Sequence, residues 1–243
     1  MSLKICIVGS KGRMGQAIAE AAIEAGHQVS SKVDVGDDLA AGIAAADVVI
    51  DFSFHTVTKS VFRAAVEFGK PVICGTTGHS QEEKAELLKI AEKTATVWAG
   101  NFSIGVNLLC YLVEKAAAAL PADYNAEIVE MHHRLKKDAP SGTALMLADA
   151  VLEPRGLSYD DLRHGREGIT GERTQREVGM HSLRGGDVVG DHTVIFSEIG
   201  ERVELTHKAS SRAIFARGAV KAAEWAVGKK PGIYSIREVL GLA

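Results

Sequence analysis

The sequence predicts an α/β fold in which a Rossmann-like, doubly wound parallel sheet is joined to a smaller α+β domain. Over the first hundred residues, short apolar segments rich in Val and Ile alternate with segments of helical periodicity. A glycine-rich turn separates the first strand from the first helix. After residue 176 the pattern changes to successive strands. The early alternation predicts a parallel sheet covered on both faces, and the later strands predict an open, mixed and mostly antiparallel sheet.

Composition and charge narrow the classes of function. The chain has 243 residues, of which 46% are hydrophobic and 24% are charged, and this length suits one large domain or two small ones. A net charge of -3 gives no reason to invoke nucleic acid or membrane. The three cysteines are far apart and form no Cys-x-x-Cys pair, which indicates reduced thiols and a cytoplasmic protein. Neither a signal peptide nor an apolar run long enough to span a bilayer is expected.

The first element is a strand from Leu3 to Val8, and the turn Gly9-Ser10-Lys11-Gly12-Arg13-Met14-Gly15 follows it. A helix with apolar Ala17, Ile18 and Ala21 comes next. Glycines at such a turn let the backbone approach a pyrophosphate, and the helix start supplies amides. The alternative is a purely structural turn, but the position at the start of an alternating chain favours dinucleotide binding.

The second strand, His27 to Asp34, ends in an acid about 20 residues past the glycines, where a carboxylate can hold the ribose hydroxyls of adenosine. Asp37 and Asp38 compete with Asp34 for this role. Three cationic side chains could instead bind the 2'-phosphate of NADPH, namely Lys11, Arg13 and Lys32. The sequence therefore does not separate NADH from NADPH.

Three more strands and two helices complete the first sheet. We expect strands at Asp47–Asp51, Pro71–Cys74 and Thr94–Ala99, and helices at Val57–Phe68 and Gln81–Lys93. Ligands of such sheets bind beyond the carboxyl ends of the strands. The turns there are small and polar, and they carry the further candidates for cofactor binding: Gly75, Thr76, Thr77, Ala99, Gly100, Asn101 and Phe102. Ordinary turn chemistry is the alternative for any one of these turns.

An apolar helix from Gly105 to Leu120 leads into the second domain. The segment Glu127–Thr143 then reads Glu-Ile-Val-Glu-Met-His-His-Arg-Leu-Lys-Lys-Asp-Ala-Pro-Ser-Gly-Thr. It begins as a strand, continues with two histidines and three basic side chains, and ends in helix-start residues before the apolar run Ala144–Ala148. Imidazoles, ammonium groups and helix-start amides together predict a site for a small anion that exchanges protons.

The rest of the chain completes both domains. We expect a long polar loop at Glu153–Glu172, strands between Glu177 and His207, a helix at Ile214–Val227 and a return to the first domain at Tyr234–Leu240. The predicted domains are residues 1–103 with 213–243 for the dinucleotide and residues 104–212 for substrate binding and oligomerisation. The open sheet needs its second face covered, and self-association would cover it.

The histidines and lysines of this segment also admit other interpretations. Adjacent side chains on a strand point to opposite faces, and no third ligand stands at suitable spacing, so His132 and His133 predict no metal site. From the residues alone, paired histidines at a strand end are more often structural or surface groups, and Lys136 and Lys137 are by default an exposed basic patch.

The segment Glu127–Thr143 resembles the signature of the 4-hydroxy-tetrahydrodipicolinate reductase (dihydrodipicolinate reductase) family. That pattern is Glu-x-x-Glu-x-His-His-x-x-Lys-x-Asp-Ala-Pro-Ser-Gly-Thr, and every fixed position is matched. The resemblance extends over the whole chain through four further blocks: Gly12–Gly15, Gly75–Gly78 with Asn101–Asn107, His181–Gly186, and His207–Arg212. Two departures concern cofactor preference: the loop after Asp51 reads Phe-Ser-Phe-His where the family often has Phe-Thr-x-Pro, and the second-strand region is short.

The resemblance implies an NAD(P)H-dependent oxidoreductase of diaminopimelate and lysine biosynthesis, which uses NADH or NADPH and usually forms a homotetramer. Its substrate would be a cyclic, unsaturated imine dicarboxylate. By the family pattern, His132 protonates the ring, Lys136 donates a proton or stabilises charge, and His133 holds the substrate. Gly142 and Thr143 would bind a substrate carboxylate, for which Arg184 and Arg212 are weaker candidates.

There are two alternatives, one of them also an enzyme and the other a protein of a different class. A related amino-acid pathway dehydrogenase, of the aspartate or homoserine dehydrogenase type, would share the nucleotide fold without needing the His-His-x-x-Lys block. A catalytically silent NAD(P)-binding regulator would be expected to carry a damaged block, and here the block is intact.

Overall fold

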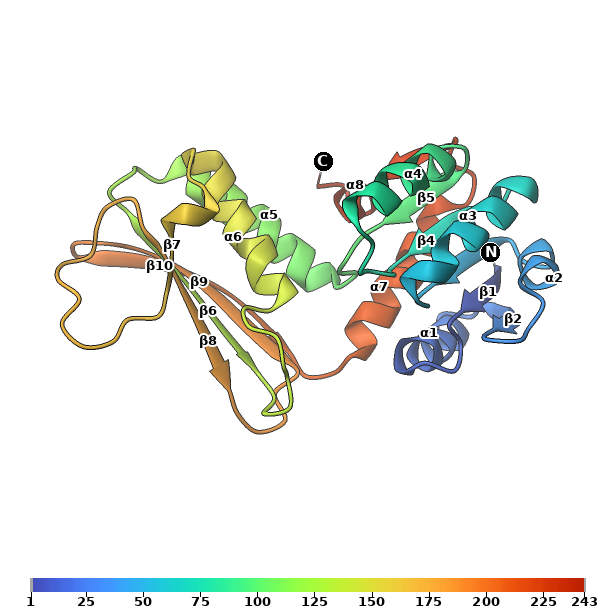
Figure 1. The fold of residues 1–243 in the computed structure, drawn as a ribbon, viewed down its shortest axis with the longest axis horizontal. Coiled ribbons are helices and arrows are strands. Elements are labelled where there is room, and N and C mark those ends of the chain that lie inside the picture. Colours follow the sequence, from blue (N-terminus) through green and yellow to red (C-terminus); the bar gives the residue numbers. More distant parts are fainter. Residues whose placement is uncertain (1, 243) are drawn as a thin grey trace. The chain divides into compact units, whose positions relative to one another are not determined.

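The computed structural model describes residues 2–242 and divides into two compact units (Figure 1). Unit 1 comprises Met1–Ile104 and Arg212–Ala243, and unit 2 comprises Gly105–Ser211. No helix within residues 2–242 combines the length and the apolar character needed to span a bilayer.

Unit 1 is built on a six-stranded parallel sheet, which confirms the predicted fold class. Its strands lie in the order β11-β5-β4-β3-β1-β2. Their bounds are Lys4–Val8 (β1), Gln28–Val33 (β2), Val48–Asp51 (β3), Val72–Cys74 (β4), Ala95–Trp98 (β5) and Gly232–Tyr234 (β11).

Helices cover both faces of this sheet because successive side chains of each strand point to opposite faces. Ile5 and Ile7 of β1 pack in a core with α1 (Arg13–Glu24), α7 (Ala213–Ala226) and α8 (Ile236–Val239). Cys6 and Val8 pack in a second core with α2 (Leu39–Ala44), α3 (His55–Glu67) and α4 (Gln81–Ala91). The sequence pattern does not predict α2, because it is six residues long and only Ile43 is buried.

Unit 2 contains a five-stranded sheet in the order β10-β9-β6-β8-β7. Its elements are α5 (Ile104–Ala119), β6 (Asn125–His132), α6 (Gly142–Arg155), a 3-10 turn (Tyr159–Asp161), β7 (Leu162–His164), β8 (Val178–Arg184), β9 (Gly190–Glu198) and β10 (Glu201–Ala209). The predicted mixed sheet is confirmed, since β9 pairs antiparallel with both β6 and β10, while β6 and β7 pair in parallel with β8. The chain between β6 and β8 includes α6, and this helical crossover allows parallel pairing.

The two faces of the second sheet differ. Helices α5 and α6 lie side by side over one face (Figure 1), and they cover a core that includes Ile128, Met180 and Phe196. The opposite face carries a mixture of polar and apolar side chains, of which Leu183 is 50% exposed. The predicted polar loop is shorter than expected, because α6 runs to Arg155 and β7 forms within it.

Candidate active site

The glycine-rich turn of unit 1 lies between β1 and α1, and the end of β2 holds it in place. The amides of Gly9 and Ser10 donate to the carbonyl oxygen of Val33 at 2.9 and 3.2 Å. Gly9 has φ +82°, and a Cβ on it would lie 2.6 Å from the carbonyl oxygen of Phe52. Only glycine fits this position, so the turn keeps its backbone open to a ligand at the start of α1.

Asp34 lies at the end of β2, next to this turn. Its carboxylate accepts hydrogen bonds from the amides of Lys11 at 2.8 Å and Val35 at 2.9 Å, and these bonds lower the pKa of Asp34. Asp37 accepts the amide of Asp34, and Asp38 caps α2 by accepting the amide of Ala41. Of the three competing acids, Asp34 is therefore the one bonded directly to the glycine-rich turn.

A cavity of about 380 Å³ adjoins Asp34. Its lining combines glycines of the turn with apolar side chains and two acids: Val8, Gly9, Gly12, Val33, Asp34, Val35, Asp37, Leu39, Phe52, Ser53, Phe54 and Val57. Apolar walls beside a carboxylate suit an adenine ring and its ribose hydroxyls. The residues present therefore fit the adenosine half of a dinucleotide.

The ends of β3, β4 and β5 carry the other candidates for cofactor binding. The amide of Ser53 donates to Thr76 Oγ1 at 3.0 Å and to Asp51 Oδ1 at 3.0 Å, which ties the first two strand ends together. Asp51 is fully buried, and burial raises its pKa. A second cavity of about 400 Å³ lies at these ends and is lined by Thr76, Thr77, Gly78, His79, Lys84, Leu88, Trp98, Ala99, Gly100 and Ile233.

Other cofactor candidates are placed differently. Lys11 and Arg13 are exposed on the turn, and Met14 packs partly against the core of α1 and α7. Asn101 Oδ1 accepts the amide of Ser103 at 2.8 Å. The side chain of Phe102 is 1% exposed within that core, so it serves packing.

In unit 2, His132 is the last residue of β6 and is 8% exposed. Its Nδ1 lies 2.5 Å from Oε2 of Glu130, which is fully buried. Arg184 donates one hydrogen bond of 2.9 Å to each oxygen of the same carboxylate. Burial alone would raise the pKa of Glu130, but its hydrogen bonds with Arg184, His132 and Ser182 bring it below the ordinary value.

The helix α6 starts beside His132. Ser141 caps the helix by accepting the amide of Ala144 at 3.1 Å, and its Oγ also lies 3.0 Å from Nε2 of His192. The rings of His132 and His192 are 5.1 Å apart. Burial, and then the charge of His132, lowers the pKa of His192 to about 4, so this ring is neutral at pH 7. Gly142 and Thr143 form the first turn of α6 next to these histidines.

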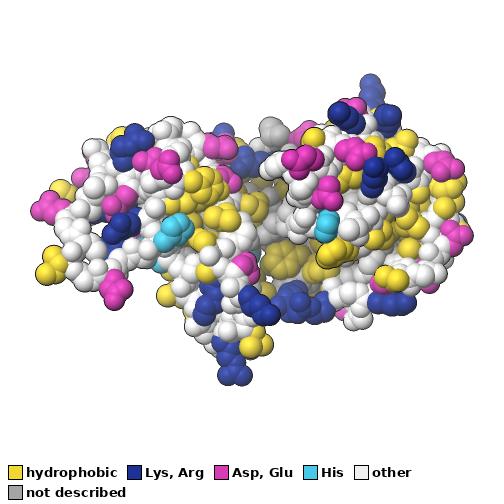
Figure 2. Space-filling model, in the orientation of Figure 1, with side chains coloured by type: hydrophobic (Ala, Val, Ile, Leu, Met, Phe, Trp, Pro, Cys, Tyr) yellow, Lys and Arg dark blue, Asp and Glu magenta, His cyan; other side chains and the backbone are white. Residues whose placement is uncertain are grey.

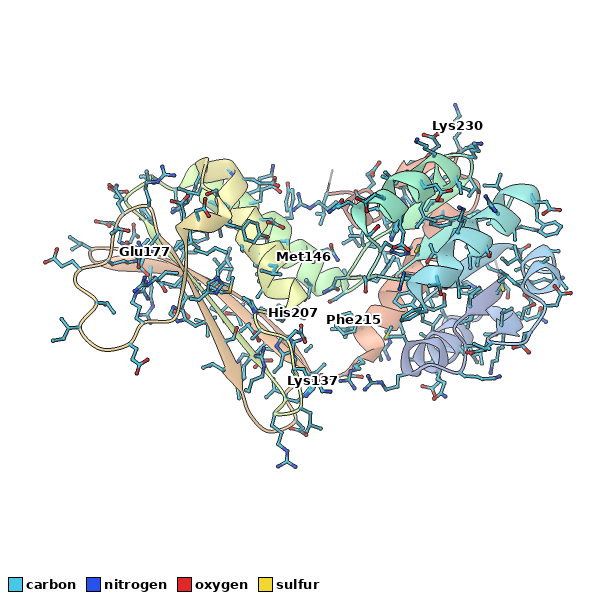
Figure 3. The ribbon with its side chains drawn as sticks, in the orientation of Figure 1. Lys137, Met146, Glu177, His207, Phe215 and Lys230 are labelled. Carbon is cyan, nitrogen blue, oxygen red and sulfur yellow. The ribbon has the colours of Figure 1, made fainter. Side chains whose placement is uncertain are left out.

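The loop between His132 and Ser141 is cationic. Lys136 Nζ lies 2.9 Å from a carboxylate oxygen of Asp138, while Arg134 and Lys137 are exposed and His133 is half-buried. Figure 2 shows Lys and Arg side chains gathered at the tip of unit 2, and Figure 3 labels Lys137 there. Lys136 is also one of the charges that lower the pKa of His192. This loop therefore offers positive charge close to the histidine pair.

Within residues 2–242 no group of three or more His, Cys, Asp or Glu side chains is placed to hold a metal ion.

A third histidine lies close to the pair. His207, labelled in Figure 3, pairs in register with His192 across β9 and β10 and lies on the same side of the sheet.

Sequence reasoning assigned no role to Glu130 or His192, and it offered Arg184 as a partner for the substrate. The structure instead pairs Arg184 with Glu130. The signal that could have identified Glu130 is its spacing, because residues two apart on a strand share a face. Glu130 thus lies between His132 and the buried Ile128 on the covered face of β6.

Comparisons with known proteins agree along the whole chain. The family described as dihydrodipicolinate reductase, N-terminus, matches residues 3–102, and the one described as dihydrodipicolinate reductase, C-terminus, matches residues 105–240. The 4-hydroxy-tetrahydrodipicolinate reductase of Akkermansia muciniphila is 50% identical, over 99% of each chain. The protein of the same name from Halorhodospira halophila is 45% identical, over 100% of each chain.

Solved structures show the same fold. A dipicolinate-bound dihydrodipicolinate reductase from Paenisporosarcina sp. TG-14 superposes with a TM-score of 0.77 at 23% identity, covering 98% of this chain and 99% of the other. A probable dehydrogenase from Thermotoga maritima gives a TM-score of 0.60 at 11% identity, covering 99% and 93%.

Proposed function

The chain belongs to the dihydrodipicolinate reductase family, and on that premise we propose that it reduces 4-hydroxy-tetrahydrodipicolinate, by way of dihydrodipicolinate, to tetrahydrodipicolinate. The reaction is an NAD(P)H-dependent step of diaminopimelate and lysine biosynthesis. The observation that carries the proposal is the intact block Glu127–Thr143, which gathers a histidine pair, a cationic loop and a helix start in unit 2.

In this proposal His132 supplies the proton that completes the reduction. A nicotinamide, when bound, would supply the hydride to the conjugated ring. The carbon next to the reduced position must then take a proton, and an imidazole can give one at neutral pH. Because Nδ1 of His132 is engaged by Glu130, the nitrogen that serves the substrate is Nε2.

The same block supplies groups for a dicarboxylate. Gly142 and Thr143 lie at the start of α6, where backbone amides and the helix dipole favour a carboxylate. Lys136 adds a positive charge and exchanges its partner Asp138 for the substrate. His133 follows His132 directly and is half-buried, which suits a group that holds the substrate.

We further propose that NADH is the preferred cofactor. The cavity next to Asp34 is lined by two carboxylates, Asp34 and Asp37, and its described lining contains no Lys or Arg. Two negative charges favour a ribose with free hydroxyls and repel a 2'-phosphate. Val35, which follows Asp34, is 92% exposed and contributes no charge.

The proposal includes a homotetramer in the cytoplasm. The uncovered face of the second sheet supports self-association, since apolar Val129, Met131 and Leu183 lie on it. The cytoplasmic location is supported by Cys6, Cys74 and Cys110, which are buried and form no disulfide within the described residues.

The test is loss of nicotinamide absorbance with substrate generated in the cuvette from pyruvate and aspartate semialdehyde by a partner synthase. Parallel runs use NADH, NADPH and a His132→Gln variant. We expect rapid turnover with NADH, slower turnover with NADPH and a loss of about 100-fold or more in kcat for the variant, the range for a general acid.

The activity, the role of His132 and the cofactor preference can each be contradicted separately. No turnover by a protein that binds NADH would replace the reductase with a silent nucleotide-binding regulator. A His132→Gln variant as active as the parent would remove His132 from the proton transfer, and a faster NADPH reaction would overturn the cofactor preference.

A further inference from the structure

Glu130 is a fully buried carboxylate with an ordered set of donors, all within unit 2. Oε2 receives Nη1 of Arg184 at 2.9 Å and lies 2.5 Å from Nδ1 of His132. Oε1 receives Nη2 of Arg184 at 2.9 Å and the amide of Ser141 at 3.3 Å. Each oxygen therefore contacts both the guanidinium and a group of the candidate active site.

Arg184 compensates the charge of the buried Glu130 carboxylate. A buried carboxylate is costly unless it is paired, and a planar guanidinium that bonds both oxygens fixes its orientation as well as its charge. Arg184 Nη2 also donates to the carbonyl oxygen of Asp138 at 2.7 Å. The pair thus contacts the cationic loop, the start of α6 and the ring of His132.

Gly190 packs against the Nε2 side of the buried His132 ring. A Cβ added to Gly190 would lie 3.0 Å from Nε2 of His132. A larger residue at position 190 would crowd Nε2, and with Nδ1 held by Glu130 the ring has one nitrogen left for a ligand.

We propose that Glu130 and Arg184 form a positioning pair that fixes the tautomer and orientation of His132 and anchors the start of α6. This inference rests on the proposed function, in which His132 gives the proton and α6 binds a carboxylate. Neither residue touches the substrate, and both act through the groups that do.

The main variant is Glu130→Gln, which keeps the shape of the side chain and removes its charge. We expect kcat to fall by about 10- to 100-fold, as for other groups that orient a functional histidine, with KM for NADH unchanged because the cofactor residues lie in unit 1. Arg184→Lys keeps the charge without the two-pronged geometry, and we expect a smaller loss of kcat. The kcat–pH profile of Glu130→Gln should shift from that of the parent.

A second readout is independent of activity. In protein labelled with 15N at its nine histidines, His132 is assigned by its absence in His132→Gln. The parent should show hydrogen on Nδ1 of the neutral His132 ring, and Glu130→Gln should lose this preference while histidines of unit 1 keep their signals. A purely structural role of Glu130 would leave the tautomer of His132 unchanged.

Two further variants serve as controls, one for folding and one for the effect on activity. Glu130→Gln with Arg184→Met removes both charges, so no unpaired charge stays buried if the single variant does not fold. Glu127→Gln is the matched control, because Glu127 lies on the opposite face of β6 and also binds arginines and a histidine. We expect Glu127→Gln to keep the parental kcat and pH profile.

A folded single or double variant with parental kcat and pH profile would overturn the inference, as would an unchanged His132 tautomer. These outcomes are distinct from failure of the proposed function, which would leave the parent protein itself without turnover while the tautomer measurement still tests the pair.

Discussion

At the scale of single residues, burial keeps one histidine of the candidate active site, His192, neutral at pH 7. His192 is 3% exposed and hydrogen-bonds Ser141, whereas among the described residues its Nδ1 finds no partner. Burial lowers its pKa from 6.5 to about 4, and the charges of His132, His207 and Lys136 add to this while that of Glu130 opposes it. A ring kept neutral can pack against His132, the proposed proton donor, without competing for the proton.

This shift predicts a pH dependence of stability. Between pH 6.5 and 4 the unfolded chain protonates His192 and the folded chain does not, so stability is lost as pH falls through that window. A shift of this size corresponds to roughly 3 kcal/mol at this buried site. We expect His192→Gln to lose less stability than the parent between pH 7 and pH 4, as measured by urea unfolding at each pH.

The control is His164→Gln, because His164 is exposed on β7 in the same unit. It should follow the parental curve. Equal losses of stability in the parent and in His192→Gln would show that His192 is not the group that titrates.

The sequence predicted the candidate residues that would contact the substrate, but not the residues that hold those candidates in place. His132, Lys136 and the start of α6 stand in one block, so their proximity follows from the chain itself. Arg184 is 54 residues from Glu130, and their pairing depends on β6 and β8 being neighbours in register. Strand register depends on packing across the whole sheet, which no local pattern encodes.

At the scale of elements, strand β6 holds a Glu–Arg–His cluster on each face. On the uncovered face Glu127 binds Arg166 at 2.8 Å, Arg173 at 3.0 Å and His181 at 2.7 Å. Arg166 and Arg173 belong to the loop 165–177 between β7 and β8. These ion pairs anchor a loop that has little apolar surface of its own to bury.

Removing the anchor should free the loop. Burial alone would raise the pKa of Glu127, but its bonds with Arg166, His181 and Arg173 lower it from 4.5 to about 2. The stabilisation is present above pH 4.5 and is lost as pH falls toward 2. We expect Glu127→Gln to lose up to about 3 kcal/mol at pH 7 and to exchange amide hydrogens faster in residues 165–177.

The matched control is Glu172→Gln, an exposed carboxylate in the same loop. It should exchange at the parental rate. If the loop stayed equally protected in Glu127→Gln, contacts other than this cluster would hold it.

Periodicity predicted the long elements and missed the short ones. In unit 1 the strands β1 to β5 and the long helices follow apolar patterns that burial requires, so they could be predicted in order, whereas α2 and β11 were missed. Strand β7 has three residues, Leu-Arg-His, and pairs with β8 alone. Its place is decided by backbone pairing along the edge of a formed sheet, for which a polar segment gives no signal.

At the scale of the whole molecule, one sheet face is left to be covered. The register places Glu127, Val129 and Met131 of β6 on this face, next to Gly179, His181 and Leu183 of β8. Arg166 and Arg173 reach over it at Glu127, and the stretch with Val129 and Leu183 lies beyond them. Edge strand β10 carries Glu201, Arg202 and Glu204, charges that disfavour association through the edge. Association through the face is therefore the geometry we expect.

Leu183→Glu tests this geometry, because Leu183 is half exposed in the described chain and its replacement costs the fold little. A carboxylate brought against a second copy would be desolvated without a partner, so the assembly should dissociate. In sedimentation velocity we expect the parent near four times the monomer mass and Leu183→Glu at a lower mass.

The control is Ile199→Glu, since Ile199 is 95% exposed in the turn between β9 and β10, and it should sediment as the parent does. A parent that sediments as a monomer would refute the tetramer, and a Leu183→Glu variant of unchanged mass would move the interface off this face.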